Sequence, residues 1–179
     1  GINIRSTVAT YINVHDELRK RFAKTESAKS KGYKAGDFSY NTGKLRCPTC
    51  DGTGTLSLDV QFLPDVHVTC PDCHGSRYNK ESYFIKYKTS KEKEYSLPEL
   101  MEMDVSFAKE ACQGLKGVYR KLEVLENLGL GYLTLGEETP SLSGGEAQRL
   151  KLASEMSKSQ NDSIFIFDIS SGISILSIN

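Results

Sequence analysis

The sequence predicts an α/β chain that is mainly helical and carries one small β-hairpin. Apolar residues recur at helical spacing in the N-terminal and C-terminal thirds of the chain. Between two pairs of cysteines they alternate with polar residues in "TLSLDVQFL", and near the end they run without interruption in "SIFIFD". The 179 residues, 38% hydrophobic and 26% charged, are typical of one globular domain with a small satellite.

Charge is unevenly distributed although the whole chain is neutral. Residues 1–50 contain ten Lys/Arg and four Asp/Glu, a surplus of six, whereas residues 101–179 contain seven and eleven. The basic part, with "RKRFAK" and "KSKGYK", suits a phosphate backbone, and a solvated helix face explains it equally well. No run approaches the ~20 apolar residues of a membrane span, and no leader is recognisable, so we expect a soluble, cytoplasmic protein.

The first half of the chain predicts one helix, a loop and a hairpin. Val14, Leu18 and Phe22 recur every four residues and predict a helix over about 13–24. The glycine-containing stretch "KSKGYKAGDFSYNTGKLR" reads as a loop. "TLSLDVQFL" predicts a half-buried strand, "VHV" its return strand, and "SYFIKYK" a further strand.

The second half predicts four helices and one strand. Short helices begin at Ser96 and near Ser106, and a longer one runs from about Val118 until Gly129 ends it. The last helix begins at Ser143. "SIFIFD" then predicts a strand buried on both faces, as in parallel sheets.

Four of the five cysteines predict a zinc site. Cys47, Cys50, Cys70 and Cys73 form the pattern C-x2-C-x19-C-x2-C, which lets two tight turns direct four thiolates at one ion. Glycines two residues after each pair, Gly52 and Gly75, suit turns that need positive φ. Disulfides are one alternative, which a reducing compartment disfavours. A redox dithiol is the other, and two matched pairs fit a single catalytic pair poorly.

The remaining cysteine and the nearby histidines are given no metal role. Cys112 reads as a small core residue, and four thiols leave no need for His67 or His74 as ligands. Basic and aromatic residues that flank the cysteines are candidate DNA contacts, to phosphate or by base stacking. These residues are Arg46, Arg77, Tyr78 and Lys80.

A second motif lies at the start of the last helix. In "LSGGE", Ser143 and Glu146 have the spacing of a capping box. Gly144 and Gly145 leave the first backbone amides uncovered at the positive end of the helix dipole, which suits a phosphate. The alternative is a helix that is merely well capped.

The motifs together resemble the ABC-type ATPases and, among them, the UvrA family, the A subunits of the bacterial excinuclease. The resemblance rests on "FLPDVHVTCPDCHGSRYN", "LGLGYLTLG" and "LSGGEAQRLKLASE" in this order, followed by an apolar strand that ends in Asp168. The matching part is the second, C-terminal ATPase half of the proteins in that family. It implies a mainly helical ABC signature domain with a small zinc-bound β-hairpin insertion and an incomplete P-loop-type nucleotide-binding lobe.

The resemblance also implies domain boundaries and residue roles. Residues 1–46 would be a basic helical segment leading into the signature domain, 47–80 the zinc module, 81–160 the signature domain, and 161–179 a truncated Walker B region. The four cysteines would bind Zn²⁺ in a module associated with damage discrimination. Ser143, Gly144 and Gly145 would contact ATP bound to an opposing ATPase unit, and Asp168 would help to hold Mg²⁺.

Partners follow from the same resemblance, and so do two departures from it. The partners expected are damaged duplex DNA, the excinuclease B subunit and a second ATPase half or homodimer partner, with no membrane. No G-x-x-x-x-G-K-[ST] loop occurs, and Ile169 stands where the family has a catalytic glutamate. We therefore expect a fragment or truncated relative that hydrolyses no ATP alone, and we assign no catalytic residue.

Other readings remain open at this stage. "CPTCDGTG" fits the C-x-x-C-x-G-x-G repeat of DnaJ-type chaperone modules, although those have four repeats and two zinc ions, and Arg77 replaces a glycine in the second pair. A UvrA-like paralogue acting in antibiotic tolerance or another DNA transaction would carry the same motifs. So would an inactive remnant that folds without function.

Overall fold

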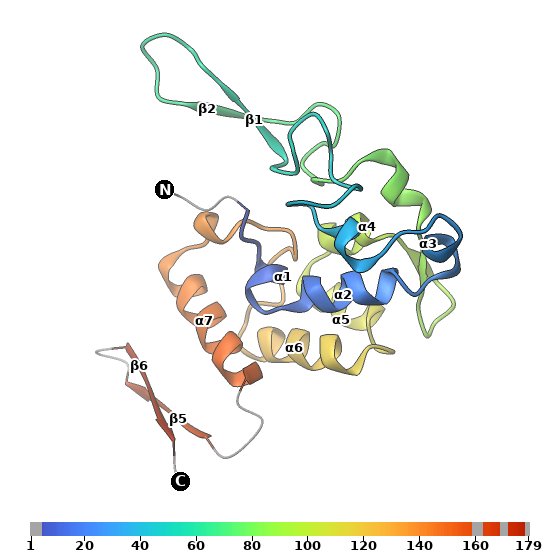
Figure 1. Cartoon of the computed structure of the whole chain (residues 1–179). Helices are drawn as coiled ribbons and strands as arrows, with labels where there is room; N and C mark the ends of the chain where they lie inside the picture. Colours follow the sequence, from blue (N-terminus) through green and yellow to red (C-terminus); the bar gives the residue numbers. More distant parts are fainter. Residues whose placement is uncertain (1–4, 159–162, 169–171, 178–179) are drawn as a thin grey trace.

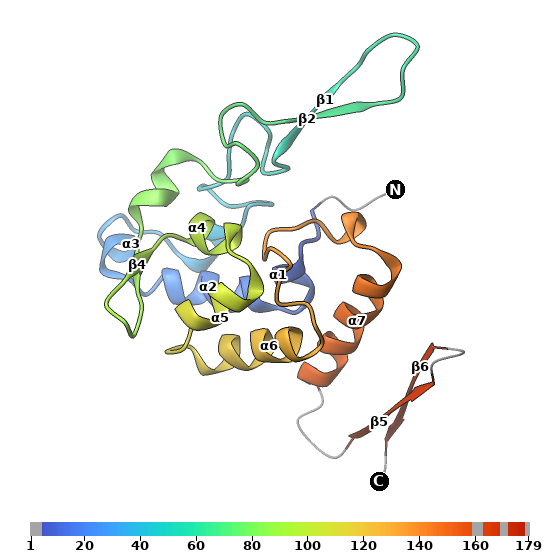
Figure 2. The ribbon, with the colours of Figure 1, turned by 180° about the vertical axis from the view of Figure 1, so that it is seen from behind.

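The computed structural model describes residues 5–158, 163–168 and 172–177, with side chains over 5–158. Helices form the body of the molecule, and a long β-hairpin projects from it (Figures 1 and 2). The α-helices are α1 (Val8–Tyr11), α2 (Val14–Phe22), α3 (Glu26–Ser30), α4 (Leu97–Glu102), α5 (Val105–Ala111), α6 (Lys116–Asn127) and α7 (Gly144–Lys158). The 3₁₀ turns are η1 (Ala35–Phe38), η2 (Lys80–Phe84) and η3 (Thr139–Ser141).

Among the described residues, six short strands form three two-stranded sheets. They are β1 (Thr55–Leu58) with β2 (Val66–Thr69), β3 (Tyr87–Lys88) with β4 (Glu94–Tyr95), and β5 (Ser163–Asp168) with β6 (Gly172–Ser177). All three pairs are antiparallel. The fold is therefore a mixture of helix and strand, as predicted, with helix predominating.

The N-terminal helix is confirmed, but the loop expected after it is partly helical. Val14, Leu18 and Phe22 of α2 are fully buried, as their four-residue spacing requires. In the following stretch, the Thr25 hydroxyl accepts a hydrogen bond from the Ala28 amide and starts α3. Phe38, buried in the core, ends η1. The low aliphatic content concealed both turns.

The hairpin between the cysteine pairs is confirmed, with shorter strands than expected. The register pairs Thr55 with Thr69 and Leu58 with Val66. Beyond β1 the side chains are open to solvent, and Phe62 is 100% exposed. The alternating pattern predicted a half-buried strand, and this was wrong because the hairpin projects from the body.

The strand expected over "SYFIKYK" was mostly wrong. The Asn79 side chain accepts a hydrogen bond from the Ser82 amide and starts the 3₁₀ turn η2 instead. Within this stretch only Tyr87 and Lys88, at its end, form a strand, and they pair with β4. A local cap at Asn79 therefore outweighs the β-propensity of the aromatic residues that follow.

The C-terminal helices begin and end where their capping residues indicate. Ser96 and Glu99 form a capping box at α4, and Asp104 caps α5 two residues before the predicted start near Ser106. Gly129, with φ of 76°, follows the end of α6. A single core unites these helices with α1 and α2, and Cys112 lies in it with no exposed surface.

The strand β5 is confirmed, but its expected setting is not. It pairs antiparallel with β6 from Ser163 and Ser177 to Asp168 and Gly172. Within the described ranges no parallel sheet of a nucleotide-binding lobe occurs, because the other described strands are paired among themselves. Ile169 lies outside the described residues. None of the described helices has the length and hydropathy needed to cross a membrane.

Candidate metal centre and signature helix

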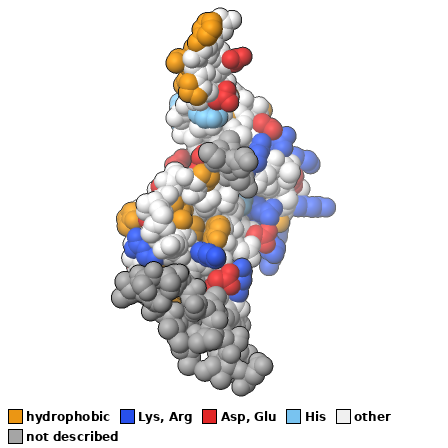
Figure 3. All heavy atoms as spheres, turned by 90° about the vertical axis from the view of Figure 1, so that its left-hand side faces the viewer, with side chains coloured by type: hydrophobic (Ala, Val, Ile, Leu, Met, Phe, Trp, Pro, Cys, Tyr) orange, Lys and Arg blue, Asp and Glu red, His pale blue; other side chains and the backbone are white. Residues whose placement is uncertain are grey.

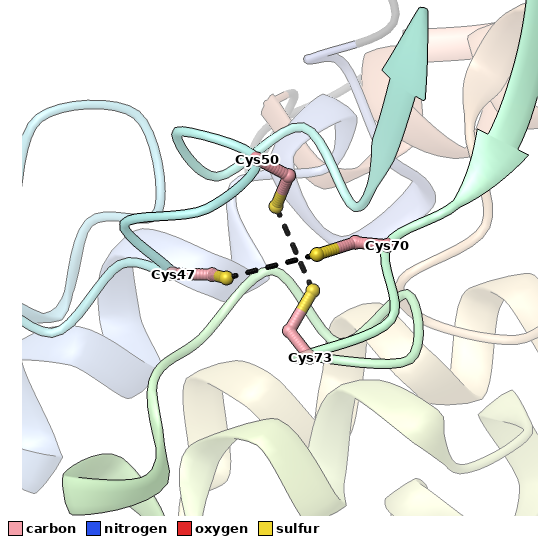
Figure 4. Close-up of side chains that lie close together, drawn as sticks. All are labelled: Cys47, Cys50, Cys70 and Cys73. Carbon is pink, nitrogen blue, oxygen red and sulfur yellow. Dashed lines mark hydrogen bonds between the residues drawn. The ribbon is translucent and has the colours of Figure 1, made fainter.

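The four cysteines of the predicted zinc site converge at the base of the projecting hairpin (Figure 4). Their sulfur atoms all lie within 4.8 Å of one another, with Cys47 and Cys70 3.9 Å apart and Cys50 and Cys73 3.6 Å apart. Four thiolates on a tetrahedral zinc ion are about 3.8 Å apart, since the Zn–S bond is about 2.3 Å. The sulfurs are too far apart for a disulfide, and all four cysteines are free and buried. The donor set therefore fits zinc.

Glycine is required in the turn after the first cysteine pair. Gly52 has φ of 78°, and a Cβ atom there would overlap the carbonyl oxygen of Tyr40. Gly54 has φ of 79° and donates its amide to the Cys50 sulfur at 3.2 Å. Gly75, in the turn after the second pair, also has a positive φ, of 87°. The positive φ predicted for Gly52 and Gly75 is confirmed.

Burial disfavours the ionised form of two of the four thiols. Burial raises the pKa of the Cys73 thiol to about 12 and is the main cause of the raised pKa of Cys47. Burial acts upward on Cys50 too, but hydrogen bonds from the Gly54 amide and neighbouring thiols outweigh it and lower its pKa. A bound metal ion would offset the cost of burying several thiolates together.

Two of the four predicted DNA contacts lie in the interior. Arg77 is 4% exposed, and its guanidinium donates to Glu138 at 2.9 Å and stands 5.1 Å from the ring centre of Tyr40. Tyr78 is 1% exposed, and its hydroxyl donates to the Phe38 carbonyl at 2.8 Å. Both side chains are enclosed by other protein groups, and this disfavours direct contact with DNA.

The other two candidates lie at the surface. Lys80 is exposed at the start of η2. Arg46 is half-buried and pairs with Asp51 at 2.9 Å, while it donates to the Asn41 carbonyl at 3.0 Å. Their contact with DNA stays a prediction.

A buried histidine that the sequence did not single out supports Tyr78. The Nε2 atom of His15 lies 2.7 Å from the Tyr78 hydroxyl. Because that hydroxyl donates to Phe38, Nε2 carries the proton and donates to it. Burial, with the charge of Arg19 nearby, lowers the pKa of His15 to about 3. His15 is therefore a neutral structural residue, and its place on the apolar face of α2 is the signal that could have found it.

The signature motif starts α7 as a complete capping box. The Ser143 amide donates to Glu146 at 3.1 Å, and the Glu146 amide donates to the Ser143 hydroxyl at 3.3 Å. Hydrogen bonds from the Ser143 side chain and amide lower the pKa of the Glu146 carboxyl. Gly144 and Gly145 are exposed, and a Cβ atom on either would meet nothing within 4 Å. The amino end of α7 is therefore open toward solvent, as an anion site requires.

Known proteins are similar to nearly the whole of this chain. The chain is 46% identical over 169 residues to UvrABC system protein A of Streptococcus pneumoniae serotype 4, and 45% identical over 165 residues to that of Lactococcus lactis subsp. lactis. These matches span 94% and 92% of the chain. The chain matches a segment of UvrA.

The structure supports this match. UvrA2 from Deinococcus radiodurans superposes over 87% of the chain with a TM-score of 0.79 and 40% sequence identity. No family model matches the chain. The resemblance to UvrA predicted from the motifs is confirmed.

The match to UvrA covers a small part of those proteins. The chain spans 17% of the length of the Streptococcus and Lactococcus proteins and 18% of the Deinococcus chain. Asp168, the predicted Walker B residue, ends β5 and pairs with Gly172, and its side chain lies outside the described part. The nucleotide and magnesium roles implied by UvrA therefore belong to a proposal.

Proposed function

We propose that this chain is the DNA-contacting, zinc-bearing part of a UvrA-like ABC ATPase of nucleotide excision repair. It would supply the signature half of a composite ATP site. The observation that supports this most is the joint presence of a four-thiol cluster and an open, capped Ser-Gly-Gly helix in a chain 46% identical to UvrA. Each feature alone fits several kinds of protein.

Zinc would be structural in this proposal. Cys47, Cys50, Cys70 and Cys73 would hold it, and it would fix the base of the hairpin against the body. All four thiols would be ligands, so no coordination position would stay open for catalysis. One zinc ion per chain is expected, and two per chain would favour the chaperone-type reading.

The nucleotide would bind between this chain and a second ATPase unit. Ser143, Gly144 and Gly145 would offer backbone amides and a hydroxyl to the terminal phosphate of ATP, and Asp168 would contribute to the Mg²⁺ site. Residues 1–46 would be a basic helical segment leading into the signature domain, 47–80 the zinc module, 81–160 the signature domain and 161–179 a truncated Walker B region. The excinuclease B subunit is a further proposed partner.

The charge of the zinc module favours a DNA contact beside the hairpin over one on the hairpin itself. Residues 47–76 contain four aspartates and no Lys or Arg. Figure 3 shows hydrophobic and acidic side chains on the projecting hairpin and blue Lys and Arg side chains gathered on the body below it. Phosphates would therefore meet residues just outside or at the ends of the module, such as Lys44, Arg46 and Lys80.

A charge-reversal experiment tests the DNA contact. We expect the Lys44→Glu/Lys80→Glu variant to bind a fluorescently labelled duplex about tenfold more weakly at low salt and with a shallower salt dependence. Lys91→Glu/Lys158→Glu, which reverses two exposed charges elsewhere, is the matched control. Equal binding by both variants, or binding of the unmodified chain that salt does not weaken, would contradict the proposal.

Nucleotide binding and lesion preference provide two further tests. The isolated chain lacks the phosphate-binding loop, so tight binding of labelled ATP would count against a composite site. A paralogue with another role would bind intact and damaged duplex equally, whereas the repair function predicts a preference for the damaged one.

A further inference from the structure

The buried residue Arg77 contacts both cysteine turns. It follows Cys73 by four positions, and its carbonyl oxygen accepts a hydrogen bond from the Cys47 amide at 2.8 Å. Its guanidinium donates to the carbonyl of Gly52, in the turn after Cys50, at 3.3 Å. The backbone of Arg77 has φ of 73°, which is unusual for a residue with a side chain. The position of Arg77 therefore depends on how the metal centre is folded.

The same guanidinium reaches the segment that leads into the signature helix. It forms a 2.9 Å ion pair with Glu138, 61 residues along the chain, and the Arg77 side chain in this pair is only 5% exposed. The Glu138 carbonyl then accepts hydrogen bonds from the amide and hydroxyl of Ser141, two residues before Ser143. A series of contacts thus runs from the cysteine turns to Ser141, and the chain continues from there to the cap of α7 at Ser143.

A cavity adjoins this pair. It has a volume of about 410 Å³ and lies between the second cysteine turn and the loop before η3. His74, Gly75 and Ser76 line it on one side, and Thr134, Gly136 and Glu137 line it on the other. The Arg77–Glu138 hydrogen bond lies beside this pocket and is charged on both sides, so it is a strong link between the two segments.

We propose that the Arg77–Glu138 ion pair couples the metal centre to the signature segment. Arg77 and Glu138 are positioning residues: neither would touch zinc or nucleotide. With zinc bound, the cysteine turns hold the guanidinium in place and the guanidinium holds Glu138, which orders residues 139–147 at the amino end of α7. Coupling of this kind is reciprocal, so a ligand on the signature segment would also stabilise the metal centre.

Hydrogen–deuterium exchange with and without zinc tests the coupling in the full chain. In the unmodified protein, removing zinc with a chelator should speed exchange of the amides in 139–147, while α6, remote from the pair, keeps its rate. In Glu138→Gln, which keeps the shape but removes the charge, the rate in 139–147 should no longer respond to zinc. Glu137→Gln removes the neighbouring charge on the same cavity and should keep the response.

Zinc release gives the reciprocal measurement. A chromogenic chelator should take zinc from Glu138→Gln about tenfold faster than from Glu137→Gln, a ratio that corresponds to ~1.4 kcal/mol. Glu138→Asp, which retains the charge, should restore part of the slow release and the exchange response. This rescue separates coupling from a general loss of stability.

The outcomes distinguish this inference from the proposed function, on whose zinc site it rests. A chain that binds no zinc overturns both. A chain that binds zinc but whose Glu138→Gln and Glu137→Gln variants respond alike overturns the coupling alone. A change in α6 as large as that in 139–147 also overturns it, since zinc loss would then act on the whole fold. DNA is used in neither measurement, so failure of DNA binding leaves the result intact.

Discussion

Gly52 is the residue at which backbone conformation and close packing coincide. Its φ of 78° disfavours a side chain, and the Tyr40 carbonyl occupies the place of a Cβ atom. We expect Gly52→Ala to lower the free energy of unfolding of the zinc-loaded protein by about 3 kcal/mol, measured by urea denaturation. Gly32→Ala is the control, because Gly32 has φ of 71° and open space around it, so only about 1 kcal/mol is expected. Equal costs would show that the Tyr40 contact is unimportant.

His15 predicts a dependence of stability on pH. Its pKa is about 3 in the folded chain and about 6.5 when unfolded, so the unfolded chain binds the proton first as pH falls. The contribution of neutral His15 is complete above about pH 6.5 and is lost toward pH 3, by up to ~1.4 kcal/mol per pH unit.

Unfolding experiments between pH 7 and 5 isolate this effect, because carboxylates titrate mostly at lower pH. We expect His15→Gln to flatten the slope of stability against pH in this range. His67→Gln, on the exposed hairpin, should keep the slope of the unmodified chain. A slope that His15→Gln leaves unchanged would place the titrating group elsewhere.

At the scale of elements, α7 depends strongly on its cap. Its first turn contains Gly144 and Gly145, which have low helix propensity, so the bonds between Ser143 and Glu146 carry more of the burden of starting the helix. Ser143→Ala should reduce the free energy of unfolding by about 1 kcal/mol and speed amide exchange in the first turn. Ser157→Ala, near the other end of α7, should leave that turn unchanged. Equal exchange in the two variants would argue against the capping role.

The hairpin of β1 and β2 is an element that cannot stand alone. Two strands of four residues have little stability in water. The side chains of residues 59–65, which connect them, are exposed. Leu56 is the one partly buried apolar residue packed against the cysteine cluster. The hairpin therefore depends on the metal centre at its base.

At the scale of the whole molecule, the two clusters of buried residues should respond differently to metal removal. The helical core holds residues from Val8 to Ala153, whereas the cysteine cluster is separate and small. Chelation should leave most of the helical circular dichroism intact while the base of the hairpin opens. Loss of all helical signal on chelation would contradict this division.

Limited trypsin digestion reports on the opening. Trypsin cleaves after Lys and Arg, and none occurs between Arg46 and Arg77. Arg77 is buried, so the zinc-loaded protein should resist cleavage after it, and the metal-free protein should be cut there. Lys80, which is exposed in both states, provides the internal reference.

Features that depend only on residues close together along the chain could be predicted from the sequence. Helix periods, the caps at Ser96 and Ser143, the glycine turns and the spacing within each cysteine pair all arise from residues within a few positions of one another. The motifs also carried the resemblance to UvrA, because their order is written in the chain.

Which polar side chains are buried and which apolar ones are exposed could be known only from the tertiary structure. Arg77 and Tyr78 looked like surface contacts beside the cysteines, yet Glu138 and His15, 61 and 63 residues away, receive them in the interior. The alternating hairpin looked half-buried, yet Phe62 meets no partner in the described part of the chain. Burial is set by contacts between distant segments, and spacing along the sequence contains no record of which segments will meet.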